Sequence, residues 1–215
     1  MQFTLVSKAN KMECWIKQLW LEERVGEFKP LYSSWPTKSI KMNLETYQET
    51  IQSTAIYPKE IGLAYTTLGL MGEFQEFCEV LGEGEHDQKK EFGDVCWYLT
   101  ASCQEAGLQI LDVFPADVHT LDKNFLMESS VKANANKALG RIAEIVKKYY
   151  RDGSFNAIDL NTEYHVFAMN LCLLANIYSI DIEEALQANY EKLQARKAKG
   201  MIGGSGSDRE EENSK

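Results

Sequence analysis

Apolar residues recur at helical spacing along two neighbouring stretches of the chain, 60–81 and 88–106. They fall every three or four positions, which places them on one side of a helix. The apolar positions are Leu70, Met71, Phe74, Phe77 and Leu81 in the first stretch, and Val95, Tyr98, Leu99 and Cys103 in the second. Residues 82–87, between the stretches, contain glycines and polar residues typical of a turn. The pattern therefore predicts a hairpin of two antiparallel helices.

A second pair of stretches with the same period follows within residues 129–199. Its apolar positions are Leu139, Ile142, Ile145 and Val146, then Val166, Met169, Leu173 and Ile177. Further helices are predicted at 43–56 and 183–199, and residues 108–118 form a loop or short helix broken by Pro115. Two apolar hairpin faces of matching period can cover each other. We therefore predict an all-α fold, a helical bundle of antiparallel hairpins.

Each helix of the first hairpin carries two acids three residues apart, Glu73 with Glu76 and Glu91 with Asp94. Residues at this spacing share one face of a helix, so four carboxylates converge across the pair. Carboxylates that converge repel one another unless a cation lies between them. Hard oxygen ligands favour Mg²⁺, with Mn²⁺ as a substitute. The four acids are therefore the predicted metal ligands.

The alternative is that such acid pairs are ordinary solvated charges, because the chain contains 32 Asp and Glu residues. Asp181 with Glu184 is a third pair at this spacing, and we interpret it as a solvated face. Gly72 and Gly93 each precede an acid of the first hairpin, and we expect both to allow close approach of the backbones.

The spacing Glu73-x-x-Glu76 followed by Glu91-x-x-Asp94 resembles the signature of the MazG-like nucleotide pyrophosphohydrolases. These enzymes belong to the all-α NTP pyrophosphatase superfamily, together with the dimeric dUTPases. Other segments that resemble the family are Tyr47-Gln48-Glu49, Thr54 to Pro58, Gly93 to Leu99, Asn189-x-x-Lys192-Leu193-x-x-Arg196, and the phage-type tail Gly204 to Arg209. In the tail the family has Gly-Ser-Gly-Asp-x-Arg. This chain has Ser207-Asp208 before Arg209, which keeps the arginine and shifts the acid.

The resemblance implies Mg²⁺-dependent hydrolysis of a nucleoside triphosphate to the monophosphate and pyrophosphate. The metal would polarise the α–β bridge and lower the pKa of a bound water, which Glu76, as the catalytic residue, would orient. The implied substrate contacts are Lys192, Arg196 and Arg209 at the phosphates, and Tyr47, Gln48, Trp97 and Tyr98 around the base. Lys192 and Arg196 have a simpler interpretation as cations near a helix C-terminus. Trp97 and Tyr98 have a simpler interpretation too, as aromatic residues of the hydrophobic core.

Two other functions stay open at this point. One is a dUTP-specific or phosphoribosyl-ATP pyrophosphohydrolase, which would share the metal site. The other is a catalytically inactive helical interaction module. Any base and sugar are compatible with the sequence, and so is each of three biological roles: pool cleansing, precursor supply or alarmone turnover.

Members of the family commonly pass from the second metal helix directly into the terminal Asn-x-x-Lys-Leu helix, whereas this chain inserts a long segment. The inserted segment resembles the first hairpin, although any two amphipathic hairpins look somewhat alike. Aligned in this way, Glu73 corresponds to Arg141, Glu76 to Glu144, Glu91 to Glu163 and Asp94 to Val166. We therefore predict a tandem, pseudo-dimeric repeat in which only the first copy binds metal.

The predicted organisation has three parts. Residues 1–41 are an N-terminal extension with an amphipathic stretch at 11–28. Residues 42–202 are the MazG-like catalytic domain, with an active repeat at 43–114 and a degenerate repeat plus terminal helix at 129–199. Residues 203–215 are a flexible C-terminal tail, rich in glycine, serine and acids.

Composition narrows the range of partners. The 215 residues are 44% hydrophobic and carry a formal net charge of −9, which argues against a nucleic-acid polymer. Five cysteines with no C-x-x-C spacing predict reduced thiols in the cytoplasm, or the host cytoplasm if a phage encodes the chain. The most apolar stretch, Val166 to Tyr178, is too short to cross a membrane. A homodimer of pseudo-dimeric chains is compatible with these features.

Overall fold

The computed structural model describes residues 37–39, 42–115, 117–119 and 127–200. The chain divides into two units, Met1–Trp35 and Pro36–Lys215. The first unit lies outside the described residues, and so does the amphipathic stretch predicted at 11–28. The tail at 203–215, with the predicted phosphate ligand Arg209, also lies outside them.

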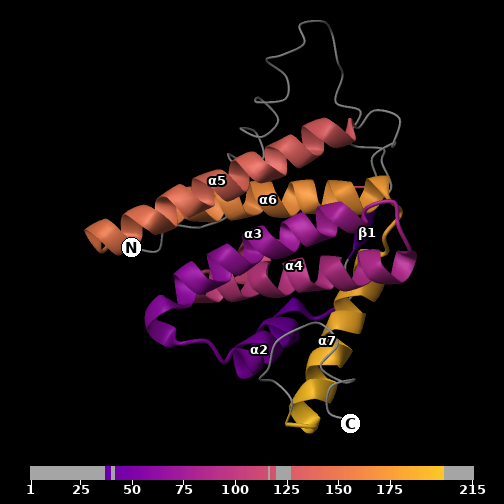
Figure 1. Cartoon of the computed structure of the whole chain (residues 1–215), viewed down its shortest axis with the longest axis horizontal. Helices are drawn as coiled ribbons and strands as arrows, with labels where there is room; N and C mark the ends of the chain where they lie inside the picture. The colour runs from indigo at the N-terminus through magenta and orange to yellow at the C-terminus, as the bar shows by residue number, and fades with distance from the viewer. Residues whose placement is uncertain (1–36, 40–41, 116, 120–126, 201–215) are drawn as a thin grey trace, which may run out of the picture. The chain divides into compact units, whose positions relative to one another are not determined.

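The described residues form six α-helices, which confirms the predicted all-α class. They are α2 (Leu44–Thr54), α3 (Gly62–Val80), α4 (Glu85–Glu105), α5 (Glu128–Asp152), α6 (Ala157–Ile177) and α7 (Ile182–Ala198), with 3₁₀ turns η2 (Lys59–Ile61) and η3 (Ile110–Asp112). Helices α3 and α4 form one antiparallel hairpin, α5 and α6 form another, and α7 crosses α4 and α2 (Figure 1). The two predicted hairpins are therefore present.

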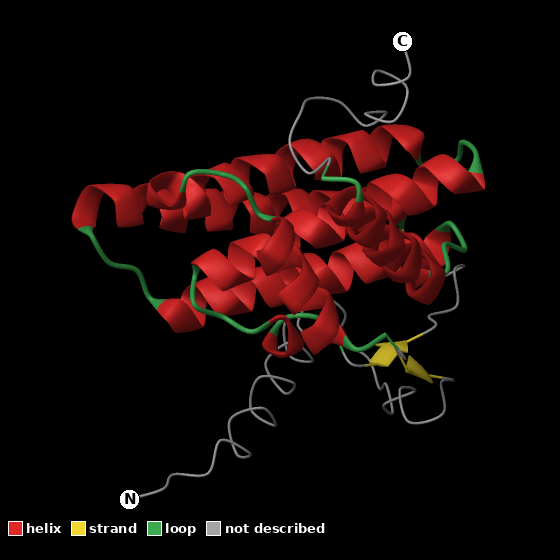
Figure 2. Ribbon diagram, turned by 90° about the horizontal axis from the view of Figure 1, so that it is seen from below, coloured by secondary structure: helices red, strands yellow, loops and turns green. Residues whose placement is uncertain are grey.

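A short β-ladder joins two segments for which the sequence predicted no strand. Strand β1 (Thr37–Ser39) pairs antiparallel with β2 (Asp117–His119), so that Lys38 lies opposite Val118 (Figure 2). The prediction of a loop or short helix at 108–118 was therefore incomplete. This region contains η3 and then β2. Strands of three residues are too short to show an alternating pattern.

Side chains cap several helices of the second unit. Asn43 caps α2 by accepting a hydrogen bond from the Thr46 amide at 3.0 Å. Asp181 caps α7 in the same way, accepting from the Glu184 amide at 3.2 Å, while the Glu184 carboxylate pairs with Lys89 of α4. The interpretation of Asp181 and Glu184 as a solvated pair was therefore incomplete: Glu184 is exposed, but Asp181 also caps the N-terminus of a helix.

The two hairpins share one core. Phe74 of α3 meets Phe167 of α6 edge to face, with ring centroids 5.2 Å apart, an arrangement worth about 0.5–1.5 kcal/mol beyond burial. Most of the predicted apolar positions of α3 are buried, but Met71 is 36% exposed. At 100° per residue Met71 is rotated away from Leu70 and Phe74 onto the outer face of the helix, so its assignment to the core was wrong.

The buried face of α6 also differs from the prediction. Val166, Met169, Leu173 and Ile177 are only partly buried, whereas the fully buried residues include Leu160, Tyr164, Phe167, Leu171 and Leu174. Helix α6 is apolar on nearly all sides, so its periodicity does not select one face. The four predicted positions are therefore at the edge of the core, next to the residues that fill it.

The described cysteines are free thiols. Cys96, Cys103 and Cys172 are buried, and Cys78 is partly buried. No single described helix is both long enough and apolar enough to cross a membrane. Among the described helices, α6 and α7 reach those limits when taken together, and they are bent by 109° at the break between them.

Candidate metal centre

Three carboxylates converge on the open side of the first hairpin. One oxygen each from Glu73, Glu76 and Glu91 lies within 4.8 Å of the others. Glu73 and Glu76 stand one turn apart on α3, and Glu91 faces them from α4. Glu91 is buried, Glu73 is half-buried and Glu76 is exposed, so the group opens to solvent on one side. The structure thus brings together three of the four predicted ligands.

The surroundings of Glu73 and Glu91 make both carboxylates harder to ionise. Burial, followed by the charges of Asp94, Glu76 and Glu91, raises the pKa of Glu73 to about 7. Burial also raises the pKa of Glu91, opposed by the Lys90 ammonium at 3.3 Å. A divalent cation would remove this repulsion, and its preferred ligands are oxygens of this kind. The donor set therefore fits Mg²⁺ or Mn²⁺.

The fourth predicted ligand, Asp94, is held by the last helix. Its Oδ1 accepts a hydrogen bond from Asn189 Nδ2 at 3.1 Å and pairs with the Lys192 ammonium. Its charge still acts on Glu73, whose pKa it raises. In this structure Asp94 therefore links the acid group to α7 and is not one of the three converging oxygens.

A chain of buried hydrogen bonds fixes this link. The Tyr47 hydroxyl of α2 donates to Asn189 Oδ1 at 2.9 Å, and Asn189 in turn donates to Asp94. Tyr47 is 1% exposed, which leaves no surface for a nucleobase. Tyr47 therefore supports the acid group indirectly, by holding Asn189, which bonds to Asp94. Asn189 was not predicted as a site residue, although its position in the Asn-x-x-Lys signature was the available signal.

Gly93 is what allows α7 to come this close. A Cβ added at position 93 would lie 2.8 Å from the Cβ of Asn189, closer than two carbon atoms can approach. The expectation of a close backbone approach is therefore confirmed at Gly93. It is wrong at Gly72, where an added Cβ would meet nothing within 4 Å.

We expect Gly93→Ala and Gly72→Ala to shift stability in opposite directions. The first substitution forces α7 away from α4, which we expect to cost about 1–3 kcal/mol. The second adds a methyl group in open space and improves helix propensity by up to about 1 kcal/mol. Thermal unfolding of both variants checks this. Equal midpoints would contradict the assigned contact with Asn189.

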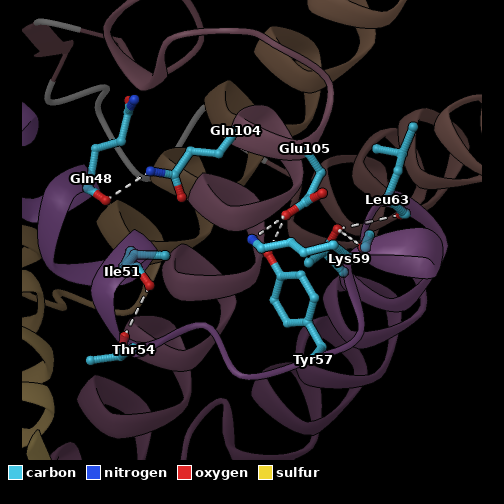
Figure 3. Close-up of polar contacts among 10 residues, drawn as sticks. Gln48, Ile51, Thr54, Tyr57, Lys59, Leu63, Gln104 and Glu105 are labelled. Carbon is cyan, nitrogen blue, oxygen red and sulfur yellow. Dashed lines mark hydrogen bonds and ion pairs between the residues drawn. The ribbon is translucent and has the colours of Figure 1, made fainter.

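The other predicted contacts divide into two groups. The side-chain Oε1 of Gln48 accepts a hydrogen bond from the Ile110 amide at 3.0 Å. Its main-chain oxygen accepts one from the Gln104 side chain at 2.8 Å, as Figure 3 shows. It therefore braces α2 against the end of α4. Lys192 reaches the acid group through Asp94, and Arg196 is one turn further along α7 and half-buried.

Trp97 and Tyr98 lie one turn beyond Asp94 on α4 and are half-buried, with ring centroids 4.7 Å apart. The ring of Tyr98 lies against Gly69, where an added Cβ would be 2.0 Å from Tyr98 Cε1. Burial and then Tyr65 raise the pKa of Tyr98, with smaller contributions from Glu73 and Asp94. An aromatic surface thus adjoins the acids.

A pocket of about 280 Å³ lies away from this centre, where α4 ends and α3 begins. Two carboxylates line it, Glu60 and Glu105. Glu105 accepts hydrogen bonds from Tyr57 at 2.9 Å and Lys59 at 3.1 Å (Figure 3). The Lys59 ammonium pairs with Glu105, and neither carboxylate of this pocket belongs to the converging group.

The raised pKa of Glu73 predicts a pH dependence of the metal-free protein. The folded value of about 7 exceeds the ordinary 4.5, so the stability linked to protonation is present below pH 4.5 and is lost as pH rises through 7. Glu73→Gln removes this loss. We expect its unfolding midpoint in chelator to exceed that of the wild type by a few degrees at pH 8 and to match it at pH 4.

The matched control for this experiment is Glu79→Gln, which replaces an exposed acid on the same helix outside the converging group. It should follow the wild type at both pH values. If Glu73→Gln loses stability between pH 4 and pH 8 as the wild type does, the repulsion does not act in the folded protein.

No family model, curated protein or solved structure compared with this chain matches it. The chemistry of the centre must therefore follow from its residues. Those residues are three converging carboxylates, an adjacent lysine and an aromatic surface.

Proposed function

We propose that the protein is a Mg²⁺-dependent nucleoside triphosphate pyrophosphohydrolase of the MazG-like type. The observation that carries the proposal is the convergence of Glu73, Glu76 and Glu91 beside Lys192. The motif resemblance points to the same reaction. One water adds to the α-phosphorus, the bond to the α–β bridging oxygen breaks, and pyrophosphate leaves with the electron pair.

The residues have distinct roles in this proposal. Glu73 and Glu91 would hold the cation, and the exposed Glu76 would complete its ligands and accept the proton of the attacking water. The chemistry that Mg²⁺ supplies when bound is neutralisation and polarisation of phosphate oxygens. Asp94, held by Asn189, positions the Lys192 ammonium beside the cation site and remains available as a fourth ligand.

Lys192 and Arg196 are the proposed partners of the leaving phosphates. Both stand on α7, one turn apart, and both are half-buried. Half-buried cations are suited to this role, because their charge-assisted hydrogen bonds to phosphate are less weakened by water than those of exposed cations. Trp97 and Tyr98 offer the proposed base contact, because they adjoin Asp94 by one helical turn. Tyr47 and Gln48 have supporting roles. Tyr47 holds α7 to α2, and Gln48 holds α2 to the end of α4.

The second hairpin supports the proposed pseudo-dimeric repeat with one active copy. At the positions aligned with Glu73 and Glu91, Arg141 and Glu163 form a salt bridge of 2.9 Å. At the position aligned with Glu76, Glu144 pairs with Lys147 and Lys148. A protein cation thus stands where the first hairpin would bind a metal ion.

We accordingly expect one nucleotide site per chain. Calorimetry with Mn²⁺ and a non-hydrolysable triphosphate should give a stoichiometry of one. The double variant Arg141→Glu with Val166→Asp restores the aligned acids, and we expect it to add a second, weaker Mn²⁺ site. Two equivalent nucleotide sites in the unmodified chain would contradict the single active copy.

A panel of common and modified ribo- and deoxyribonucleoside triphosphates tests the proposed reaction. The expected products are the monophosphate and pyrophosphate in equal amounts, with activity lost in chelator. Strict preference for dUTP or phosphoribosyl-ATP would assign the chain to one of the narrower enzymes. Lack of turnover with every compound, together with no stabilisation by Mg²⁺, would leave the inactive interaction module.

A further inference from the structure

The pocket beside Glu105 is lined by both hairpins. The first hairpin contributes residues of η2, the start of α3 and the end of α4, and the second contributes the end of α5. Figure 1 shows the start of α3 and the end of α5 at the same end of the two hairpins. The volume of about 280 Å³ is close to the lower limit of small-molecule sites, about 300 Å³, so a small ligand fits. This cavity is called the hairpin-end pocket below.

The side chains of the hairpin-end pocket carry one excess negative charge. Its carboxylates are Glu60 and Glu105, and its ammonium, Lys59, pairs with Glu105 at 3.1 Å. Two carboxylates against one ammonium leave the charge of Glu60, which is exposed and forms no ion pair with another described residue. This excess charge disfavours an anionic ligand and favours a cation.

The backbone around the pocket favours the same sign of charge. Helix α5 ends here, at Asp152, and the C-terminal end of a helix carries partial negative charge. Helix α3 begins here, but its Ala64 amide donates to the Tyr150 hydroxyl at 3.2 Å, and its Gly62 amide donates to the Lys59 carbonyl. These two amides are therefore already bonded within the protein and are not available to an anion.

Two tyrosine rings line the side of the pocket that α5 provides. The ring centroids of Tyr149 and Tyr150 lie 5.3 Å apart, with an angle of 73° between the ring planes. Tyr149 packs edge to face against Phe155 at 5.4 Å, and the hydroxyl of Tyr150 is bonded to Ala64. Both rings are thus held in place. Tyrosine rings attract ammonium groups and also pack against apolar groups.

Lys59 shows how this part of the protein holds an alkylammonium group. Its Nζ bonds to the Glu105 carboxylate and lies 5.1 Å from the centroid of the Tyr57 ring (Figure 3). A carboxylate and a tyrosine ring are therefore the partners of this ammonium. The pocket offers the same two kinds of partner a second time, in Glu60 and Tyr150.

We propose that the hairpin-end pocket binds a small primary amine, with the ammonium group at Glu60 and an apolar or aromatic body against Leu63, Tyr149 and Tyr150. The bound amine contacts both hairpins, so it stabilises the packing of α5 against the first hairpin. The inference does not depend on the proposed function, because the pocket contains no residue of the acid group.

Calorimetric titration of the full chain with phenethylamine tests the proposal. Phenethyl alcohol and hydrocinnamate are the matched controls, because they keep the aromatic body and carry no charge or a negative charge. We expect saturable binding of one amine per chain, binding of the alcohol weaker by about 10-fold or more, and no binding of hydrocinnamate. Absence of saturable amine binding, or equal binding of either control compound, would overturn the proposal.

Variants test the location of the amine. Glu60→Gln removes the unpaired charge and Tyr150→Leu removes one ring, and each should weaken amine binding by about 10-fold or more. Both side chains are exposed, so the fold should survive, and circular dichroism checks this. Glu49→Gln, which replaces an exposed acid of α2 outside the pocket, should bind as the wild type does. Wild-type affinity in Glu60→Gln or Tyr150→Leu, or displacement of the amine by Mn²⁺, would place the amine elsewhere and contradict the proposal.

Discussion

Glu76→Gln is expected to reduce the rate of pyrophosphate release by about 10³-fold or more, because the variant loses both a cation ligand and the proposed proton acceptor. The fold should survive, since the Glu76 side chain is exposed and glutamine has nearly the same shape. In the metal-free state the variant should be at least as stable as the wild type, because one of three repelling charges is gone. Steady-state kinetics and thermal unfolding measure the two effects.

Glu79→Gln is the control for this variant, since it removes a charge from the same helix three residues further on. It should keep near-wild-type activity, because Glu79 is not one of the converging carboxylates. If Glu76→Gln retains comparable activity in Mg²⁺, the acid group is not the catalytic centre.

Lys192→Met is expected to raise KM for the triphosphate by about 10- to 100-fold. A hydrogen bond to a charged group contributes about 1.5–3 kcal/mol, and methionine keeps the length of the side chain without its charge. Removal of the ammonium also takes away the charge that pairs with the Asp94 carboxylate, which keeps its bond to Asn189. We therefore expect the affinity for Mn²⁺ in the absence of nucleotide to stay the same or increase.

These opposite effects separate a phosphate contact from general damage to the site, which would weaken both metal and nucleotide binding. Lys197→Met is the matched control, because Lys197 lies on the same helix but bonds to Ser53 at 3.0 Å. A Lys192→Met variant with unchanged KM would assign Lys192 to helix stability alone.

The first hairpin and its convergent acids could be predicted from the sequence, because the helical period of α3 and α4 determines both which residues are buried and where the acids lie. The pattern that buries Phe74 and Phe77 also turns Glu73 and Glu76 to the other side of the same helix. A single turn between α3 and α4 then brings Glu91 opposite. Helix periodicity and one turn are sufficient to predict such a site, since all three carboxylates come from one hairpin.

The parts that depend on α7 could not be predicted in this way. The bond from Asn189 to Asp94 spans 95 residues, and it requires the close approach at Gly93 that only the packed structure reveals. Tyr47 and Gln48 were expected at the base, but the Tyr47 hydroxyl bonds to Asn189, and Gln48 bonds to Gln104 and Ile110. A polar residue in a motif can hold a substrate or a neighbouring helix, and sequence spacing does not distinguish these roles.

The central claim is that the converging carboxylates bind a divalent cation. Calorimetric titration of Mn²⁺ into metal-free protein tests this directly, with Glu91→Gln and Glu79→Gln titrated in parallel. We predict saturable binding at one site in the wild type and in Glu79→Gln, and at least a 10-fold loss of affinity in Glu91→Gln, equivalent to about 1.4 kcal/mol. Absence of saturable binding, or equal affinity in all three proteins, would contradict the claim.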